Sequence, residues 1–413
     1  MLSAQDAETL ILNLVHPLDA QQVEVLDLLS ASGRVLATPV SGKLDFPHWD
    51  NSAMDGYAVR YEDVQASSTE HPVCLTIVEE IPAGAVPQKS VQAGQAARIL
   101  TGSMMPDGAD TIVIQEETQR EGDRITILAA PQPQAFVRHQ GEFYRAGDRL
   151  LSAGIRLSAP DIAVLATAQC TQVTVYRRPR VAILSTGDEL VSPEQPLQPG
   201  QIVDSNQYAL AALVASNGAE PIRLGSVPDQ PEALRQAIAH AITVADIVLS
   251  SGGVSVGDYD YVDRILAELG AEMHIRSVAV RPGKPLTVAT FAQDAATSPV
   301  LYFGLPGNPV SALVSFWRFV QPALRKLSGL QAEWQPRFVW GRSTHDLKSD
   351  GKRETYLWGR AQWRGNAYEF ERAGGSHSSG NLINLAQTNA LGIIPIGQTA
   401  IAAGDRVQMM LVD

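Results

Sequence analysis

Cysteine is scarce in this chain of 413 residues, which has only Cys74 and Cys170. Neither lies in a CxxC or CxxH pattern, so we expect no structural zinc site and no disulfide framework. The eight histidines form no HxH or HxxxH pair, which argues against a cage for a transition metal. This cysteine usage is typical of a reducing compartment.

Positive charge is also in short supply. Lys and Arg number 32 against 44 Asp and Glu, for a net charge of −12. This balance excludes general nucleic-acid binding, which needs a basic surface. No Lys or Arg precedes Arg34, so we expect no secretory signal. The chain has no run of about 18 apolar residues, so no transmembrane helix is predicted. We therefore predict a cytoplasmic protein.

The length and the 45% apolar content predict two to four domains with ordinary cores. Residues 3–37 have apolar spacing typical of one or two helices, the first capped by Ser3 or Asp6 and the second ended by Gly33. Residues 47–139 are rich in short β-branched runs such as VCLTIVEEI and predict a small inserted β domain. Helical texture returns after it, so we expect a discontinuous helical region over 1–46 and 140–178.

The second half of the chain alternates strand-like and helix-like runs from RVAILSTGDEL onward. Such alternation predicts a doubly wound parallel sheet over residues 179–329, with helices on both faces. Residues 330–413 return to strand-like runs, such as ETYLWGRAQW, and predict a C-terminal β barrel or sandwich. The overall expectation is a multidomain protein of α/β and β parts.

Three loops are expected at the carboxyl ends of the parallel strands, where open α/β sheets bind ligands. They are STGDEL (185–190), SSGGVSVGDYDY (250–261) and GLPGNPVSA (304–312). Backbone N–H groups in such turns bind anions. Gly and Pro also end strands where no ligand is present, so one loop alone would carry little weight. None of the three matches GxGxxG or GxxxxGK[ST].

Carboxylates recur in and near these loops, at Asp188, Glu189, Asp229, Asp258 and Asp260. They would repel a phosphate unless a hard cation lay between, and Mg²⁺ is commonly held by one or two carboxylates plus substrate phosphates. Glu189 and Asp260 are the preferred metal ligands, whereas Asp258 is better explained as a helix cap.

Basic residues cluster in two further segments. VRPGKPL places Arg281 and Lys284 around a Pro-Gly turn, and GKRETYLWGR contains Arg353. In an acidic chain these segments predict an anion pocket, although a solvated charged turn is the alternative. Polar loops around Asp55 and Thr101 in the inserted domain are better explained as turns than as a site. The Ser-rich segment GGSHSSGNL near the C-terminus is similar, and its alternatives are a mobile loop and an anion-binding loop.

The ordered motifs DNSAMDGYAVR, TGSMMPDGAD, STGDEL, SSGGVSVGDYDY, RPGKP and GLPGNPVSA resemble those of the MoeA-type molybdopterin molybdenumtransferases, which are similar to the E domain of gephyrin. The resemblance spans nearly the whole chain. It implies insertion of molybdate into adenylylated molybdopterin with release of AMP, assisted by Mg²⁺. It also implies a four-domain homodimer whose cleft lies between the sheet domain of one subunit and the inserted β domain of the other.

The resemblance assigns site residues position by position. The catalytic candidates are Asp55, Thr101, Glu189, Asp229 and Asp260, with Glu189 and Asp260 as metal ligands. The substrate-binding candidates are Ser250, Gly252, Gly253, Ser255, Pro306 and Pro309 for the pterin and its phosphate, and Arg281, Lys284, Ser311, Arg353 and Ser379 for molybdate.

One position departs from the family pattern. The family often has Gly-Glu-Asp where this chain has Gly141, Glu142 and Phe143, so either that carboxylate is dispensable or Glu142 replaces it. Two other functions stay open: a molybdopterin adenylyltransferase, whose family resembles the sheet domain alone, and a non-catalytic molybdopterin-binding scaffold.

Overall fold

The computed structural model describes residues 1–252, 259–292 and 298–412, and the side chains of residues 259–261 are not described. The chain divides into two compact units. Unit 1 comprises residues 1–38, 153–159 and 172–413, and unit 2 comprises residues 39–152 and 160–171. The finer division into four domains stays a prediction.

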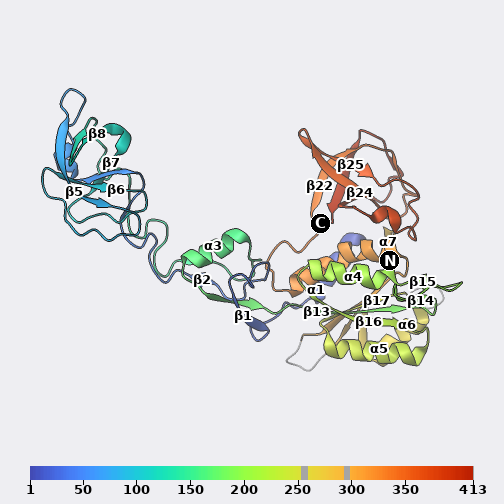
Figure 1. Ribbon diagram of the computed structural model, residues 1–413. Coiled ribbons are helices and arrows are strands. Elements are labelled where there is room, and N and C mark those ends of the chain that lie inside the picture. Colours follow the sequence, from blue (N-terminus) through green and yellow to red (C-terminus); the bar gives the residue numbers. More distant parts are fainter. Residues whose placement is uncertain (253–258, 293–297, 413) are drawn as a thin grey trace. The chain divides into compact units, whose positions relative to one another are not determined.

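A six-stranded sheet lies at the centre of unit 1 (Figure 1). Its order is β16 (Glu220–Val227), β13 (Arg180–Thr186), β17 (Ile247–Ser251), β21 (Val300–Leu305), β20 (Pro285–Phe291) and β18 (Ala271–Ser277). The first four strands are parallel, as the alternating sequence predicted, whereas β20 and β18 are antiparallel.

Alternate residues of β13 supply two separate cores. Val181 and Ile183 pack into one cluster with Leu210 of α4, and Ala182 and Leu184 pack into another with Ile238 of α5. Successive side chains of a strand point to opposite faces, so a fully apolar strand needs helices on both sides. The helices of this region are α4 (Ser205–Ser216), α5 (Pro231–Val244), α6 (Tyr259–Glu268), α7 (Pro309–Ser315) and α8 (Gln321–Leu327). The doubly wound prediction is confirmed.

The C-terminal part of unit 1 is a closed five-stranded barrel. Its strands, in order, are β24 (Glu354–Arg364), β25 (Ala367–Arg372), β22 (Phe338–Ser343), β28 (Arg406–Leu411) and β26 (Ala390–Ile394), and β26 pairs with β24 to close it. The short strand β19 (Val280–Arg281) adds to the start of β24, so it joins the sheet region to the barrel. Unit 1 also contains two short strand pairs, β14 (Leu190–Val191) with β15 (Ile202–Val203) and β23 (Leu347–Lys348) with β27 (Ala400–Ile401). It further contains the 3₁₀ turn η3 (Ile383–Leu385).

The helical N-terminal region is only partly confirmed. Helix α1 (Ala4–Leu14) is present, and Ser3 Oγ caps it by accepting the Asp6 N–H at 3.0 Å. The expected second helix is wrong, because β1 (Val23–Asp27) occupies that segment and pairs with β12 (Gln172–Tyr176). Gly33, at φ +75°, lies in a turn rather than at a helix end. The partner strand is nearly 150 residues away, so local apolar spacing could not reveal the pairing.

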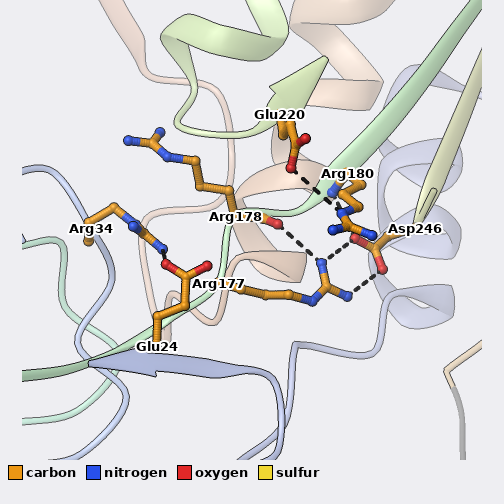
Figure 2. Close-up of polar contacts among 7 residues, drawn as sticks. All are labelled: Glu24, Arg34, Arg177, Arg178, Arg180, Glu220 and Asp246. Atoms are coloured by element: carbon orange, nitrogen blue, oxygen red, sulfur yellow. Dashed lines mark hydrogen bonds and ion pairs between the residues drawn. The ribbon is translucent and has the colours of Figure 1, made fainter. Parts of the chain in front are cut away.

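Asp246 anchors the segment that follows β12 to the amino ends of the parallel strands (Figure 2). Its carboxylate accepts hydrogen bonds from both terminal nitrogens of Arg177 at 2.7 Å and from the backbone N–H of Arg180, also at 2.7 Å. Arg180 and Glu220, which begin neighbouring strands, form a looser pair at 3.6 Å. A bidentate Arg–carboxylate pair has fixed geometry, so this contact sets where β13 begins.

Unit 2 is built around a second six-stranded sheet, which confirms the inserted β fold. Its strands run in the order β7 (Thr111–Ile114), β4 (Gly56–Val59), β6 (Gln95–Ile99), β5 (Val73–Ile81), β9 (Arg124–Ile127) and β8 (Thr118–Glu121). The unit also contains α2 (Tyr61–Val64), the 3₁₀ turn η1 (Gln115–Glu117), α3 (Ala159–Thr167), and the pairs β3 (Asn51–Ser52) with β10 (Val137–Arg138) and β2 (Val40–Ser41) with β11 (Arg149–Leu151). Within the described ranges, none of the helices combines the length and apolarity that a bilayer crossing requires.

Candidate functional site

An open pocket of about 960 Å³, here called the acidic pocket, lies at the carboxyl ends of the parallel strands. Among the predicted residues, Glu189, Asp229, Gly252, Pro306 and Pro309 line it. Asp204 adds a third carboxylate, and no described Lys, Arg or His contributes to its wall. The pocket therefore has a negative surface, which a bare phosphate would avoid.

The loops around the acidic pocket approach one another closely because of glycine. Gly252 has φ +95°, and a Cβ there would lie 2.4 Å from the Thr186 carbonyl oxygen. A side chain at Gly252 would therefore push the first and third loops apart. Asn206 joins the loops further, since its Nδ2 donates to Ser251 Oγ at 2.7 Å and to the Gly307 carbonyl at 2.8 Å.

Two polar atoms at this pocket are buried without a partner among the described residues. They are Asn206 Oδ1 and Thr186 Oγ1, both on residues that line the acidic pocket. Buried polar atoms are normally hydrogen-bonded, so such atoms indicate a place where a ligand or ion supplies the contact.

The carboxylates in and beside the acidic pocket make different contacts. Asp204 caps α4 and accepts the Gln207 N–H and the Ser226 hydroxyl, both at 3.2 Å. Asp188 accepts the backbone N–H of Asp229 at 3.1 Å, which holds the first loop against the second. Glu189 and Asp229 both line the pocket and are the candidates for holding a cation there. No group of three His, Cys, Asp or Glu side chains in the described ranges could hold a metal alone, so a cation there would need ligand oxygens as well.

Ser250 is buried and does not line the acidic pocket. Its hydroxyl shares a 2.5 Å hydrogen bond with the Tyr302 hydroxyl, and burial raises the pKa of Tyr302 to about 12. Gly253 and Ser255 fall outside the described residues, as does Asp258, and the side chain of Asp260 is not described.

A second open pocket of about 730 Å³, the basic pocket, brings together five predicted residues. Arg281, Lys284, Ser311, Arg353 and Ser379 all line it, although they come from four separate segments. Three further side chains of basic type, Lys348, Arg372 and His377, line the pocket and were not predicted from the sequence. These three lie on barrel strands and their connections, and only the closing of the barrel brings them to the predicted cations.

One carboxylate lies among the cations of the basic pocket. Asp350 Oδ2 is 3.1 Å from Arg281 Nη1. The backbone N–H of Lys352 first, and then the charges of Arg281, Arg353 and Lys352, lower the pKa of Asp350. Asp350 is therefore an ionised carboxylate that offsets part of the positive charge of the basic pocket.

His377 supplies a neutral polar group to the same wall. Its ring lies tilted against that of Trp358, with centroids 4.3 Å apart, and its Nε2 lies 2.7 Å from the Ala373 carbonyl oxygen. Burial lowers the pKa of His377. The Nδ1 atom is buried and has no partner among the described residues.

Pro285 lines both the acidic and the basic pocket, so the two pockets adjoin. Pro285 begins β20, directly after the Arg281–Lys284 turn. A ligand that reached across Pro285 would meet carboxylates at one end and guanidinium and ammonium groups at the other.

Asp55 and Thr101 contact each other within unit 2. Asp55 Oδ1 accepts the Thr101 N–H at 2.7 Å and its hydroxyl at 2.8 Å. These two bonds, the backbone one first, lower the pKa of Asp55. Elsewhere in this unit, Glu142 accepts the His139 N–H at 3.0 Å, and Phe143 is 58% exposed beside the Phe46 ring.

Three family models match the chain in order. They are the MoeA N-terminal region (domain I and II) at residues 2–168, the probable molybdopterin binding domain at residues 182–326, and the MoeA C-terminal region (domain IV) at residues 341–412. A crystal structure of the molybdopterin biosynthesis MoeA protein from Pyrococcus horikoshii OT3 is similar over all of both chains, with a TM-score of 0.84 and 29% identity.

Curated relatives agree with the family models. The molybdopterin molybdenumtransferase of Haemophilus influenzae is 38% identical over 76% of this chain and 75% of its own length. The molybdopterin molybdenumtransferase of Nostoc sp. is 62% identical over 99% of this chain and 94% of its own length. At that identity and coverage, this chain belongs to the MoeA family, the molybdopterin molybdenumtransferases.

Proposed function

We propose that this protein inserts molybdate into adenylylated molybdopterin with release of AMP, in a Mg²⁺-dependent reaction that forms molybdenum cofactor. One observation carries the proposal: an acidic pocket and a basic pocket adjoin at Pro285. The substrate would place its linked phosphates where a cation is required and its molybdenum-accepting part beside a pocket that suits an oxyanion.

The residues of the acidic pocket fit Mg²⁺. Glu189 and Asp229 offer the carboxylate oxygens that this ion prefers, and Asn206 Oδ1 is a neutral oxygen without a described partner. Asp260, a further ligand in the proposal, has no described side chain. When bound, Mg²⁺ would offset the charge of the two phosphates and of the departing AMP. Gly252, Pro306 and Pro309 allow the backbone to lie close to the pterin.

Molybdate would bind in the basic pocket. Arg281 and Arg353 offer planar guanidinium donors, Lys284 adds a point charge, and Ser311 and Ser379 add hydroxyl groups. Positioning and charge stabilisation suffice for this transfer, so no protein nucleophile is required. Asp55 and Thr101 would complete the site from the inserted β domain.

We extend the proposal to a cytoplasmic homodimer in which each cleft combines the sheet region of one subunit with the inserted β domain of the other. A sedimentation mass near twice 44.4 kDa would support the dimer, and a monomeric mass would contradict it. In a mixture of Thr101→Ala and Glu189→Gln chains, recovery of activity would support the shared cleft.

The test of function is AMP release from adenylylated molybdopterin with Mg²⁺, measured with and without molybdate. We expect release that depends on molybdate. Glu189→Gln and Asp229→Asn should raise the Mg²⁺ concentration needed for half-maximal release. Glu194→Gln is the matched control, because Glu194 is exposed and lies outside the acidic pocket.

Two results would favour the other functions. Formation of adenylylated molybdopterin from ATP would identify an adenylyltransferase. Tight binding of the pterin with no AMP release would identify a scaffold, and it would direct attention to Phe143.

A further inference from the structure

A buried chain of hydrogen bonds runs from the N-terminal helix to the wall of the basic pocket. Arg318 donates from one terminal nitrogen to Glu8 and from Nε to the Tyr356 hydroxyl at 3.0 Å, and that hydroxyl donates to Glu354. Arg318 is 4% exposed, Glu8 9% and Tyr356 0%. A buried guanidinium is costly unless it is paired, so these contacts hold Arg318 in one position.

Arg318 owes its place to an interruption of the helix. It lies in the π-helical segment η2 (Phe316–Val320) between α7 and α8. Pro322 has no N–H to donate to the Arg318 carbonyl, so the regular α-helical ladder cannot continue there. The preceding helix, α7, carries Ser311 of the basic pocket. The π-helical segment that contains Arg318 therefore continues directly from the helix that supplies Ser311 to the wall of the basic pocket.

The other end of the hydrogen-bond chain lies at the start of β24. Glu354 and Tyr356 are two residues apart, so they share one face of that strand. The Glu354 N–H donates to the Ala279 carbonyl at 3.0 Å, and Arg281 is in register with Thr355. Arg353, directly before β24, approaches the Val280 carbonyl at 3.4 Å. A cation from the sheet region and one from the barrel thus meet at this short pairing.

We propose that Tyr356 is a positioning residue for the oxyanion: held by Arg318, it fixes the start of β24 so that Arg353 stays in the basic pocket with Arg281. Asp350 pairs with Arg281, but no carboxylate of the described residues forms an ion pair with Arg353. Like charges repel, so the Arg353 guanidinium would move away from Arg281 unless the backbone beneath it were fixed. Tyr356 joins the barrel strand to the helical segment and is itself part of the pocket wall. This inference rests on the proposed function, which makes molybdate the anion.

Direct titration of the full chain with molybdate tests the proposal. Tyr356→Phe removes one hydroxyl and should weaken molybdate binding roughly tenfold, the scale of one lost charge-assisted contact. In an Arg353→Gln background, Tyr356→Phe should have no further effect, because the residue it positions is gone. Ser343→Ala is the matched control, since it removes a buried hydroxyl that donates to His345 at 2.6 Å elsewhere in the barrel. It should leave molybdate affinity unchanged.

Arg318→Lys serves as a second variant if Tyr356→Phe does not fold. It keeps a charge beside Glu8 but lacks the Nε–H that reaches Tyr356, so the same loss is expected. Wild-type affinity in a folded Tyr356→Phe protein would overturn the inference, and so would an equal loss in the Arg353→Gln background. A wild-type protein that bound no molybdate would contradict the proposed function itself, and this inference with it.

Discussion

Asp350 pairs with Arg281 inside the basic pocket, with 3.1 Å between the carboxylate and guanidinium atoms. The pair is partly exposed, 34% for the Asp350 side chain and 51% for Arg281. The Asp350 carboxylate is thus paired with Arg281, one of the cations that the proposed function assigns to molybdate binding.

Asp350→Asn should therefore tighten molybdate binding. The substitution removes a negative charge that competes for Arg281, and an exposed pair of this kind predicts a gain of roughly two- to fivefold. Titration with molybdate at low ionic strength measures it, and added salt should reduce the gain. Asp346→Asn is the control, because Asp346 is close in sequence, just before β23, but lies outside the pocket. Weaker binding by Asp350→Asn would show that Asp350 instead holds Arg281 in its productive position.

Thr101→Val should raise the pKa of Asp55. The Thr101 hydroxyl is one of two donors that stabilise the Asp55 carboxylate, and the backbone N–H is retained in the variant. NMR titration of the Asp55 carboxyl carbon measures the change. An unchanged Asp55 titration would mean that the hydroxyl bond does not persist in solution.

The same contact predicts a dependence of stability on acid. Because the folded pKa of Asp55 is lower than its unfolded value of about 3.9, its stabilising effect is present above that unfolded pKa. The effect is lost as the pH falls through the folded pKa. The difference in thermal midpoint between wild type and Thr101→Val should therefore be constant at neutral pH and shrink below about pH 4.

Asp246→Asn should lower the free energy of unfolding by about 1–3 kcal/mol, because it weakens a bidentate, partly buried pair and a bond to the Arg180 backbone. Denaturant unfolding measures the loss. Glu220→Gln is the control from the same cluster (Figure 2), since its pair with Arg180 is exposed and 3.6 Å long. It should cost less than about 0.5 kcal/mol. Equal effects of the two substitutions would contradict this ranking.

Phe143→Asp tests the departure from the family pattern. Phe143 is 58% exposed, so the change should alter the free energy of unfolding by less than about 0.5 kcal/mol. If the missing carboxylate limits the reaction, AMP release should become faster in this variant. An unchanged rate, together with a slower rate in Glu142→Gln, would show that Glu142 has taken over that role.

Local patterns in the sequence were sufficient for most elements of the fold. The apolar runs of β13 and β17 and the spacing in α4 and α5 predicted a sheet covered on both faces, because burial on two sides requires those patterns. The segment VCLTIVEEI likewise forms β5. The segment Val23–Asp27 was predicted as helix and is a strand, since its pairing partner lies far along the chain.

The residues of the candidate site that lie in recognisable sequence motifs could be predicted. Glu189, Gly252, Arg281 and Lys284 stand in loops whose composition already indicated a ligand, and the structure places them in two adjoining pockets. Three features of the site could not be predicted from the sequence, because each depends on barrel closure or on a π-helical turn. They are the contribution of Arg372 and His377, the pairing of Asp350 with Arg281, and the buried hydrogen bonds of Arg318.

The sequence by itself determined the types of element, the polarity of the loops and the supply of cations in an acidic chain. These follow from residue-by-residue chemistry. Only the tertiary structure decided that acids and cations gather in separate pockets sharing Pro285, because β19 must pair with β24 before Arg281 and Arg353 can meet. Contacts between segments more than 70 residues apart arise from packing, which no local pattern records.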